Sequence, residues 1–124
     1  IIEAGNDLPT AFSMIHIFPT NGAVGRIGAH ETPWGFRESN FSVAIIGVDP
    51  DPMNKERITK WAKNSWSAIH PYSTGGGYLN FMMDEGTKRV ESSYEENYSR
   101  LAQIKAKYDP NNFFHINQNI LPKA

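Results

Sequence analysis

Apolar runs separated by turn residues predict several short strands along the chain. Two β-prone runs, residues 12–18 and 41–48, are mostly apolar, and a shorter one covers 78–83. A fourth strand is expected over 23–30, directly after the turn signal at 19–22. Because the run 41–48 is nearly all apolar, we expect that strand to be covered on both faces.

Helical periodicity begins after the second of these runs. Asp49 and Asp51 stand next to prolines, in the positions of residues that cap a helix, and His70 with Pro71 ends the pattern. The apolar stripe has the spacing of one buried helical face: Ile58, Trp61, Ala62, Ser65 and Ile69. The carboxylates are therefore interpreted as caps, in preference to a calcium site or an acid–base pair.

A second long helix is predicted in the last third of the chain. It should start at Ser92, because Glu95 follows at the spacing of a capping box, and stop at Asp109 and Pro110. One face would hold Tyr94, Tyr98, Leu101, Ile104 and Tyr108. With no regular alternation of strand and helix, the element order predicts an α+β fold, an antiparallel β-sheet with helices packed on one face.

Composition limits the classes of function. The chain has 124 residues, 12 Lys+Arg against 13 Asp+Glu and no cysteine. A net charge of -1 gives no field for phosphate backbones or anionic lipid, so neither nucleic acid nor a membrane is an expected partner. The chain begins at Ile1 without an initiator Met or a signal-like run, and we expect it to be a piece of a longer protein. Its localisation stays open.

Simple chemical motifs are weak. The glycines at 22, 25 and 28 lack the spacing of a nucleotide-binding loop and fit bulges or close packing in a sheet. The four histidines are too scattered for two to share a metal, and no metal site is predicted. Asn40 and Asn97 stand in glycosylation sequons, but Asn97 falls inside the expected helix, where glycosylation is disfavoured.

The last third of the chain carries four motifs in a fixed order, and they resemble the end of berberine-bridge-enzyme-like FAD-linked oxidases. That family's pattern reads roughly YxNY, NYxRL, IKxKYDPxNxF and NQxI. The matching segments are Tyr78-Leu79-Asn80-Phe81, Asn97-Tyr98-Ser99-Arg100-Leu101, Ile104 to Phe114, and Asn117-Gln118-Asn119-Ile120. Upstream, residues 22–37 also resemble the family's glycine-led strand and the Thr/Pro-aromatic-x-x-Arg loop after it.

The resemblance implies a vanillyl-alcohol-oxidase type of flavoenzyme, with FAD as cofactor and an FAD-binding domain upstream in the same protein. Residues 1–108 would then be the C-terminal part of the substrate-binding domain, and residues 109–124 a tail that returns to the FAD-binding domain. Tyr78 and Asn80 would face the flavin or a small-molecule substrate. Alternation along a strand agrees with this, because it places both side chains on one face.

Two positions depart from the family pattern. Phe81 stands where many members have a catalytic Tyr, and Val43 falls where some have a catalytic Glu, so neither can accept a proton. Alternation also puts Phe81 opposite to Asn80, so the strand must bend if both face the flavin. No catalytic residue is therefore assigned, and either the base comes from outside this chain or the reaction needs none from these positions.

Two hypotheses follow. In the first, the chain is a segment of an FAD-dependent oxidoreductase that transfers a hydride from a small organic substrate to flavin, with oxygen as final acceptor, and the segment alone is inactive. In the second, it is a non-enzymatic α+β binding or dimerisation module, which the inert Phe81 and Val43 favour.

Overall fold

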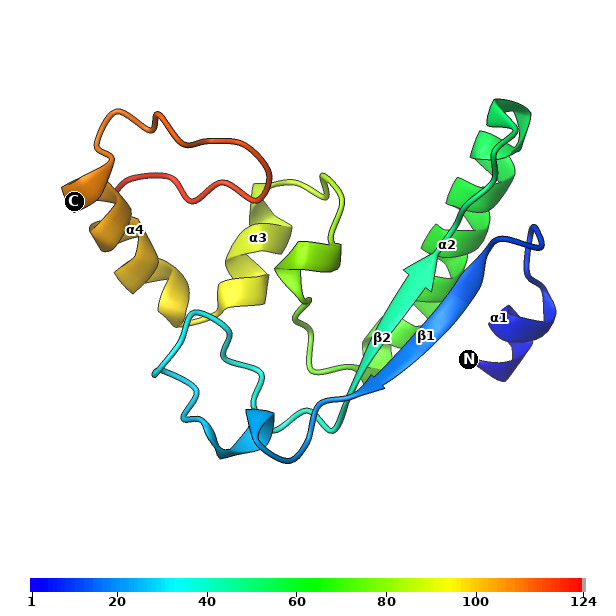
Figure 1. Ribbon diagram of the computed structural model, residues 1–124, viewed down its shortest axis with the longest axis horizontal. Coiled ribbons are helices and arrows are strands. Elements are labelled where there is room, and N and C mark those ends of the chain that lie inside the picture. Colours follow the sequence, from blue (N-terminus) through cyan, green and yellow to red (C-terminus); the bar gives the residue numbers. More distant parts are fainter. Residues whose placement is uncertain (124) are drawn as a thin grey trace. The chain divides into compact units, whose positions relative to one another are not determined.

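The computed structural model describes residues 1–123 and divides into two compact units (Figure 1). The first unit consists of Ile1–Pro19 and Phe41–Ser73. The second consists of Thr20–Asn40 and the chain from Thr74 onward. Each unit therefore combines two segments that are distant in the sequence.

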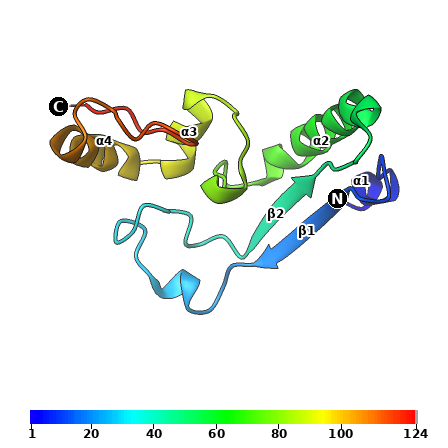
Figure 2. The ribbon, with the colours of Figure 1, turned by 45° about the horizontal axis from the view of Figure 1, so that its top comes forward.

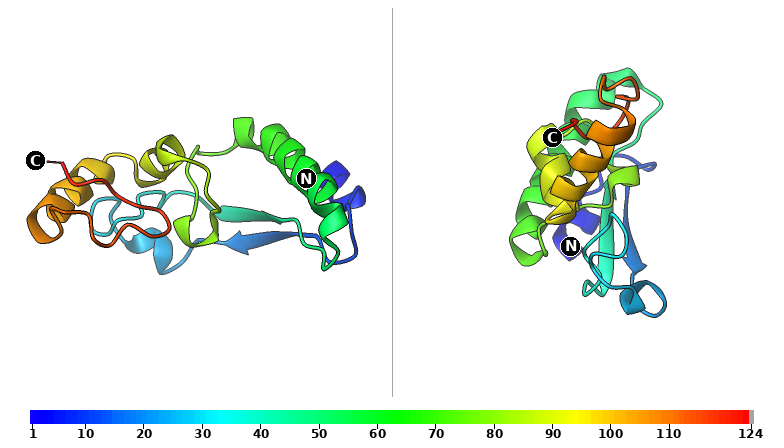
Figure 3. Two further views of the ribbon diagram at one scale, coloured as in Figure 1. Left: turned by 90° about the horizontal axis from the view of Figure 1, so that it is seen from above. Right: turned by 90° about the vertical axis from the view of Figure 1, so that its left-hand side faces the viewer.

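The first unit is a two-stranded antiparallel sheet with a long helix along one face. Strand β1 (Met14–Pro19) pairs with β2 (Phe41–Ile46), and helix α2 (Lys55–Ile69) runs beside them (Figures 1 and 3). At Gly47, just after β2, an added Cβ would lie 3.2 Å from the Cβ of Ile58 on α2. Glycine therefore lets the end of the strand approach the helix closely.

Register and burial explain how this unit holds together. Ile15 lies opposite Ile45, and the short helix α1 (Ile2–Asn6) is tied to α2 because the indole Nε1 of Trp61 donates to the carbonyl of Ala4 at 3.2 Å. The stripe predicted for α2 is confirmed: Trp61 and Ser65 are buried, and its other members are half-buried. Asp51 caps the 3₁₀ turn before α2, as the carboxylate–proline pattern indicated.

The second unit contains two helices and long irregular segments. Helix α3 (Thr87–Tyr94) is followed by α4 (Asn97–Tyr108), and the tail after residue 108 runs back along both (Figures 1 and 2). Near its end the tail is attached to α4, since the backbone N–H of Lys123 donates to the carbonyl of Ala102 at 3.2 Å. The end predicted for this helix, at Asp109, is confirmed.

The strand predicted over 23–30 is wrong. Only a 3₁₀ turn, Val24–Arg26, forms there, and the N–H of Gly28 donates to the Glu31 carboxylate at 2.8 Å. This local bond uses a donor that a sheet ladder would need. Gly25 also lies against the backbone, because an added Cβ would be 3.4 Å from the carbonyl oxygen of Arg37. The segment is an exposed loop.

The strand predicted over 78–83 is also wrong, because residues Leu79–Phe81 form a 3₁₀ turn. The N–H of Phe81 donates to the carbonyl of Tyr78 at 2.9 Å, and the N–H of Met82 to that of Leu79 at 3.2 Å. These local bonds use donors and acceptors that a sheet ladder would need. The apolar run was too short to distinguish the two structures.

The predicted second helix is in fact two helices. It begins at Thr87, after Gly86 at φ +85°, and breaks at Glu95, whose φ is +50°. Ser92 is not a cap: its hydroxyl and that of Ser93 both donate back to the carbonyl of Arg89, at 2.9 and 2.8 Å. Such back-bonding bends and weakens a helix, and α3 ends at Tyr94, directly after Ser93.

The α+β class with an antiparallel sheet is confirmed, but the sheet has two strands within residues 1–123. The side chains of β2 are half-buried or exposed, so the expected cover on both faces is absent from this part of the chain. The buried hydrophobic side chains of residues 1–123 are Phe36, Trp61, Val90 and Ala102. None of the helices described here has the length and apolar character that a membrane crossing requires.

Candidate functional site

The candidate site is the loop of residues 75–83, here called the site loop, which carries Tyr78 and Asn80. The 3₁₀ turn brings these two side chains together, and Asn80 Nδ2 donates to the Tyr78 hydroxyl oxygen at 3.0 Å. This bond leaves the hydroxyl proton of Tyr78 and the amide oxygen of Asn80 unpaired within residues 1–123. One exposed donor and one exposed acceptor therefore stand side by side.

Phe81 lies on the same side of the loop as Tyr78. In a 3₁₀ turn residues three apart are eclipsed, and the two rings meet edge to face with centroids 5.2 Å apart. Alternation required a strand to bend if Asn80 and Phe81 were to face the same way. In the structure a 3₁₀ turn, and not a bent strand, brings these positions together. The Tyr78 side chain is 44% exposed and Phe81 60%. The site loop presents an aromatic surface with a polar edge.

Sequence reasoning missed Trp34 as a neighbour of this surface. Its ring stands edge-on to Tyr78 with centroids 6.5 Å apart, and the Arg37 guanidinium lies over it at 4.8 Å. Arg37 also donates to the Thr32 hydroxyl, which closes the loop around Trp34. The Thr/Pro-aromatic-x-x-Arg pattern was the available signal, but it carried no information on which part of the chain the tryptophan would contact.

The ring of Phe36 packs against the backbone of the site loop. This ring is buried, and an added Cβ at Gly76 would lie 1.9 Å from two of its carbons. No side chain fits in that space, so a glycine is required where the loop crosses the ring. The backbone of the site loop is thereby seated directly on an aromatic surface.

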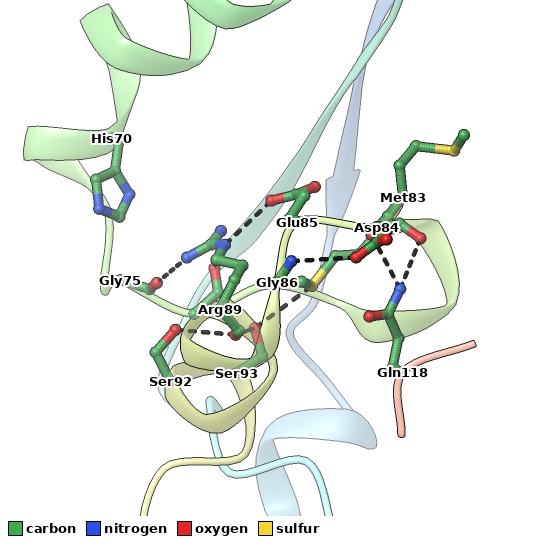
Figure 4. A network of polar contacts seen from close by, with 12 residues as sticks. His70, Gly75, Met83, Asp84, Glu85, Gly86, Arg89, Ser92, Ser93 and Gln118 are labelled. Carbon is green, nitrogen blue, oxygen red and sulfur yellow. Dashed lines mark hydrogen bonds and ion pairs between the residues drawn. The ribbon is translucent and has the colours of Figure 1, made fainter. Parts of the chain in front are cut away.

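Two polar side chains bind the two ends of the site loop (Figure 4). At its start, Arg89 of α3 donates to the carbonyls of Gly75 and Gly76 at 2.5 and 3.5 Å. At its end, the side-chain amide of Gln118 in the tail donates to the carbonyls of Met82 and Met83 at 3.0 and 3.1 Å. Side chains therefore replace the missing strand partner.

Asn97 anchors the loop that precedes Trp34. Its amide Nδ2 lies within hydrogen-bond distance of the carbonyls of Ala29, Thr32 and Pro33, the shortest at 2.8 Å to Ala29. Asn97 is only 7% exposed. Burial and these bonds exclude it as a glycosylation acceptor in the folded protein and give the first residue of the NYxRL motif a structural role.

Asp109 organises the start of the tail. Its carboxylate accepts from the backbone N–H groups of Phe113 and Phe114 at 2.7 and 3.0 Å, and it pairs with Lys105. The hydrogen bond from Lys105 is the main cause that lowers the pKa of Asp109, and the two backbone donors act in the same direction. Lys105 in turn donates to the carbonyl of Phe114. We refer to this group as the Asp109 clamp.

Metal-binding clusters and hollows are the other features that could mark a site. No group of three or more His, Asp or Glu side chains in residues 1–123 is placed to hold a metal ion. A hollow of about 480 Å³ in the first unit is lined by α1 and α2 residues, including Trp61 and Arg57. A second, of about 120 Å³, is lined by residues that include His30 and Arg100. Neither is lined by Tyr78 or Asn80.

Comparison with known proteins assigns part of the chain to a family. The family model described as berberine and berberine like matches residues 77–121. This segment runs from the site loop through α3 and α4 to the tail, and it includes Tyr78, Asn97, Asp109 and Gln118. Residues 77–121 are therefore a berberine-like segment. The motifs quoted from the sequence are thus members of one family pattern.

Curated relatives agree. An FAD-linked oxidoreductase of Dictyostelium discoideum is 30% identical over 123 residues, which are 98% of this chain and 26% of that protein. Tetrahydroberberine oxidase of Berberis wilsoniae is 30% identical over 121 residues, covering 84% of this chain and 23% of the relative. The chain spans about a quarter of the length of the curated relatives it matches.

A solved structure shows the same fold. A variant of Physcomitrella patens BBE-like 1 matches 89% of this chain and 23% of its own length, with a TM-score of 0.77 and 24% identity. The berberine-like fold therefore extends over most of both units.

Replacing Gly76 with alanine should destabilise the site loop, because the new Cβ has no space beside the Phe36 ring. We expect Gly76→Ala to lower the free energy of unfolding by about 1–3 kcal/mol, measured by urea denaturation of the full-length protein. Gly5→Ala in helix α1, where nothing lies within 4 Å, should not destabilise the protein. The double variant Gly76→Ala/Phe36→Leu should cost less than the sum of the two single changes. Strict additivity would contradict the contact.

The stabilisation that the Asp109 clamp provides should be lost at low pH. Because its folded pKa is lowered, the clamp stabilises the protein above the ordinary carboxyl pKa, and this contribution is lost as the pH falls through the folded value, below about pH 4. Amide-exchange protection at Phe113 and Phe114 should fall in that range. In Asp109→Asn it should already be reduced at neutral pH. If the protection of these two amides in the unsubstituted protein did not change as the pH was lowered below about 4, the clamp would be contradicted.

Proposed function

We propose that this chain is the C-terminal part of an FAD-dependent oxidoreductase and forms one wall of its substrate site. The observation that supports this most strongly is the match of residues 77–121 to the berberine-like family, since that segment carries the site loop. The curated relatives are named FAD-linked oxidoreductase and oxidase. FAD, when bound, accepts a hydride from a small organic substrate, and we propose oxygen as the final electron acceptor.

The residues of the site loop suit one wall of such a site. Tyr78 and Phe81 present ring surfaces, and the Tyr78 hydroxyl with the Asn80 amide presents a donor beside an acceptor. A flavin, or an aromatic substrate, has ring faces and polar edges. The rings of Tyr78 and Phe81 can stack on such a face, and the Tyr78 hydroxyl and the Asn80 amide can orient a polar edge. Tyr78 and Asn80 are the residues we assign to that contact.

Proton transfer is not assigned to this chain. Phe81 has no ionisable group, and Val43 lies on β2 opposite Ile17 in an apolar setting. A base, where the reaction needs one, comes from the rest of the protein. The proposed role of residues 1–124 is to bind, orient and exclude water.

An upstream FAD-binding domain completes the proposed site. The described residues bury few hydrophobic side chains, and the tail exposes large ones: Phe113 at 75%, Phe114 at 76% and Ile116 at 82%. Exposed apolar side chains at this density are typical of an interface. We propose that residues 1–108 belong to the substrate domain and that residues 109–124 dock on the FAD-binding domain.

A second candidate is a non-enzymatic binding or dimerisation module. It is favoured by the apolar side chains at positions 81 and 43, where the family pattern has a proton acceptor. The two candidates differ in whether the protein carries flavin.

Flavin content is the direct test. We expect the purified full-length protein to be yellow and to release FAD on denaturation. Residues 1–124 expressed alone should bind no FAD and oxidise no substrate, because they supply one wall only. A colourless full-length protein that remains colourless after incubation with FAD would refute the oxidoreductase and leave the binding module.

Phe81→Tyr tests whether a base has been lost at this position. Since we place the base elsewhere, the rate of flavin reduction in the full-length enzyme should change by less than about threefold, measured by stopped-flow absorbance with a hydride donor found by screening alcohols and amines. A general base contributes about 10²–10⁴-fold. A hundredfold gain would therefore overturn the assignment. Phe12→Tyr, at an exposed site outside the site loop, is the matched control.

A further inference from the structure

The site loop has few backbone bonds of its own. Within residues 75–83 the 3₁₀ turn supplies two backbone bonds, from Phe81 to Tyr78 and from Met82 to Leu79. A loop without a ladder is held by whatever binds its carbonyl groups. The positions of Tyr78 and Asn80 therefore depend on side chains from other segments.

Met82 is the point at which the end of the turn is fixed. Its sulfur lies 3.4 Å from the oxygen of the Ser93 hydroxyl, whose proton goes to the carbonyl of Arg89, and against Gly77, where an added Cβ would be 3.0 Å away. Its carbonyl accepts from Gln118 at 3.0 Å. The same residue donates its N–H into the turn, so a shift of Met82 moves the segment that carries Asn80 and Phe81.

Gln118 uses its whole donor capacity on this segment. A side-chain amide has two N–H groups, and those of Gln118 bind the adjacent carbonyls of Met82 and Met83, about 35 residues earlier in the chain. The side chain is half-buried, so its bonds are partly shielded from competing water. Figure 4 shows the Gln118 amide pointing toward the segment that carries Met83.

The tail backbone is shaped to present this amide. Asn117 adopts a left-handed φ of +65°, which asparagine tolerates better than most residues, and the N–H of Asn119 closes a tight turn on the carbonyl of Asn117 at 2.9 Å. The Asp109 clamp and the Lys123 bond to Ala102 hold the tail on either side of this turn. Gln118 is thus the tail's direct connection to the site loop.

We propose that Gln118 is a positioning residue: through the carbonyls of Met82 and Met83 it fixes the turn that places Tyr78 and Asn80 against flavin or substrate. The inference rests on the proposed function. It also gives the tail a role besides docking, because any displacement of residues 117–119 is transmitted to the site loop. Tail docking and the geometry of the site are then coupled.

Gln118→Met in the full-length, flavin-loaded protein tests this. Methionine has a similar length and volume but no N–H donors and no charge, so it removes both bonds with little change of packing. We expect the amide-exchange protection of Phe81 and Met82, whose N–H groups form the turn, to fall about tenfold, as the loss of two hydrogen bonds implies. The visible circular dichroism of bound FAD and its affinity for sulfite, which adds to oxidised flavin, should change as well. Gln103→Met on the exposed side of α4 should alter none of these.

Two results separate the possible failures. If flavin is bound and Gln118→Met lowers only the melting temperature, with loop protection and flavin spectra unchanged, Gln118 is merely structural and the inference is wrong. If the full-length protein holds no flavin, the proposed function itself fails. Should Gln118→Met not fold, Gln118→Asn, which keeps the donors at shorter reach, must show smaller changes of the same kind, and unchanged values would overturn the inference.

Discussion

The second unit depends on side-chain donors that satisfy the carbonyl groups of its loops. Buried or half-buried backbone carbonyls need partners, and among residues 20–40 and 74–123 no strand provides them. Asn97 binds the loop before Trp34, Arg89 binds the start of the site loop, and Gln118 binds its end. Remove these donors and the segments carrying Trp34, Tyr78 and Asn80 lose the bonds that define their course.

This constraint explains most of the family motifs in the chain. Asn97 of the NYxRL motif, Asp109 of the YDP motif and Gln118 of the NQ motif all hold backbone groups. By contrast, within residues 1–123 the side chains of Tyr78 and Asn80 of the YxNY motif hold no backbone group. They present an exposed hydroxyl and an exposed amide. The motifs therefore separate into those that shape the backbone and one that offers chemistry. A search for catalytic residues among the most recognisable motif positions would have selected mainly structural ones.

Sequence patterns predicted the parts of the fold that local chemistry determines. The two paired strands, α2 with its buried stripe and the end of α4 at Asp109 all follow from periodicity and capping. The segments 23–30 and 78–83 were mispredicted, because their backbone bonds are local turns supported by residues such as Gln118, about 35 positions away. The break at Glu95 had no signal either. Alternation along a strand placed Tyr78 and Asn80 on one face, and in the structure a 3₁₀ turn brings the two side chains together.

Few buried hydrophobic side chains, an aromatic surface with a polar edge and an exposed apolar tail all fit a chain that acts together with a flavin-binding partner domain. That is the central claim, and a crystal structure of the full-length protein purified with its flavin tests it most directly. In that structure we expect the side chains of Tyr78 and Asn80 to lie at contact or hydrogen-bond distance from the isoalloxazine ring or from a ligand stacked on it. A structure in which both side chains face bulk solvent, with the flavin bound elsewhere, would contradict it.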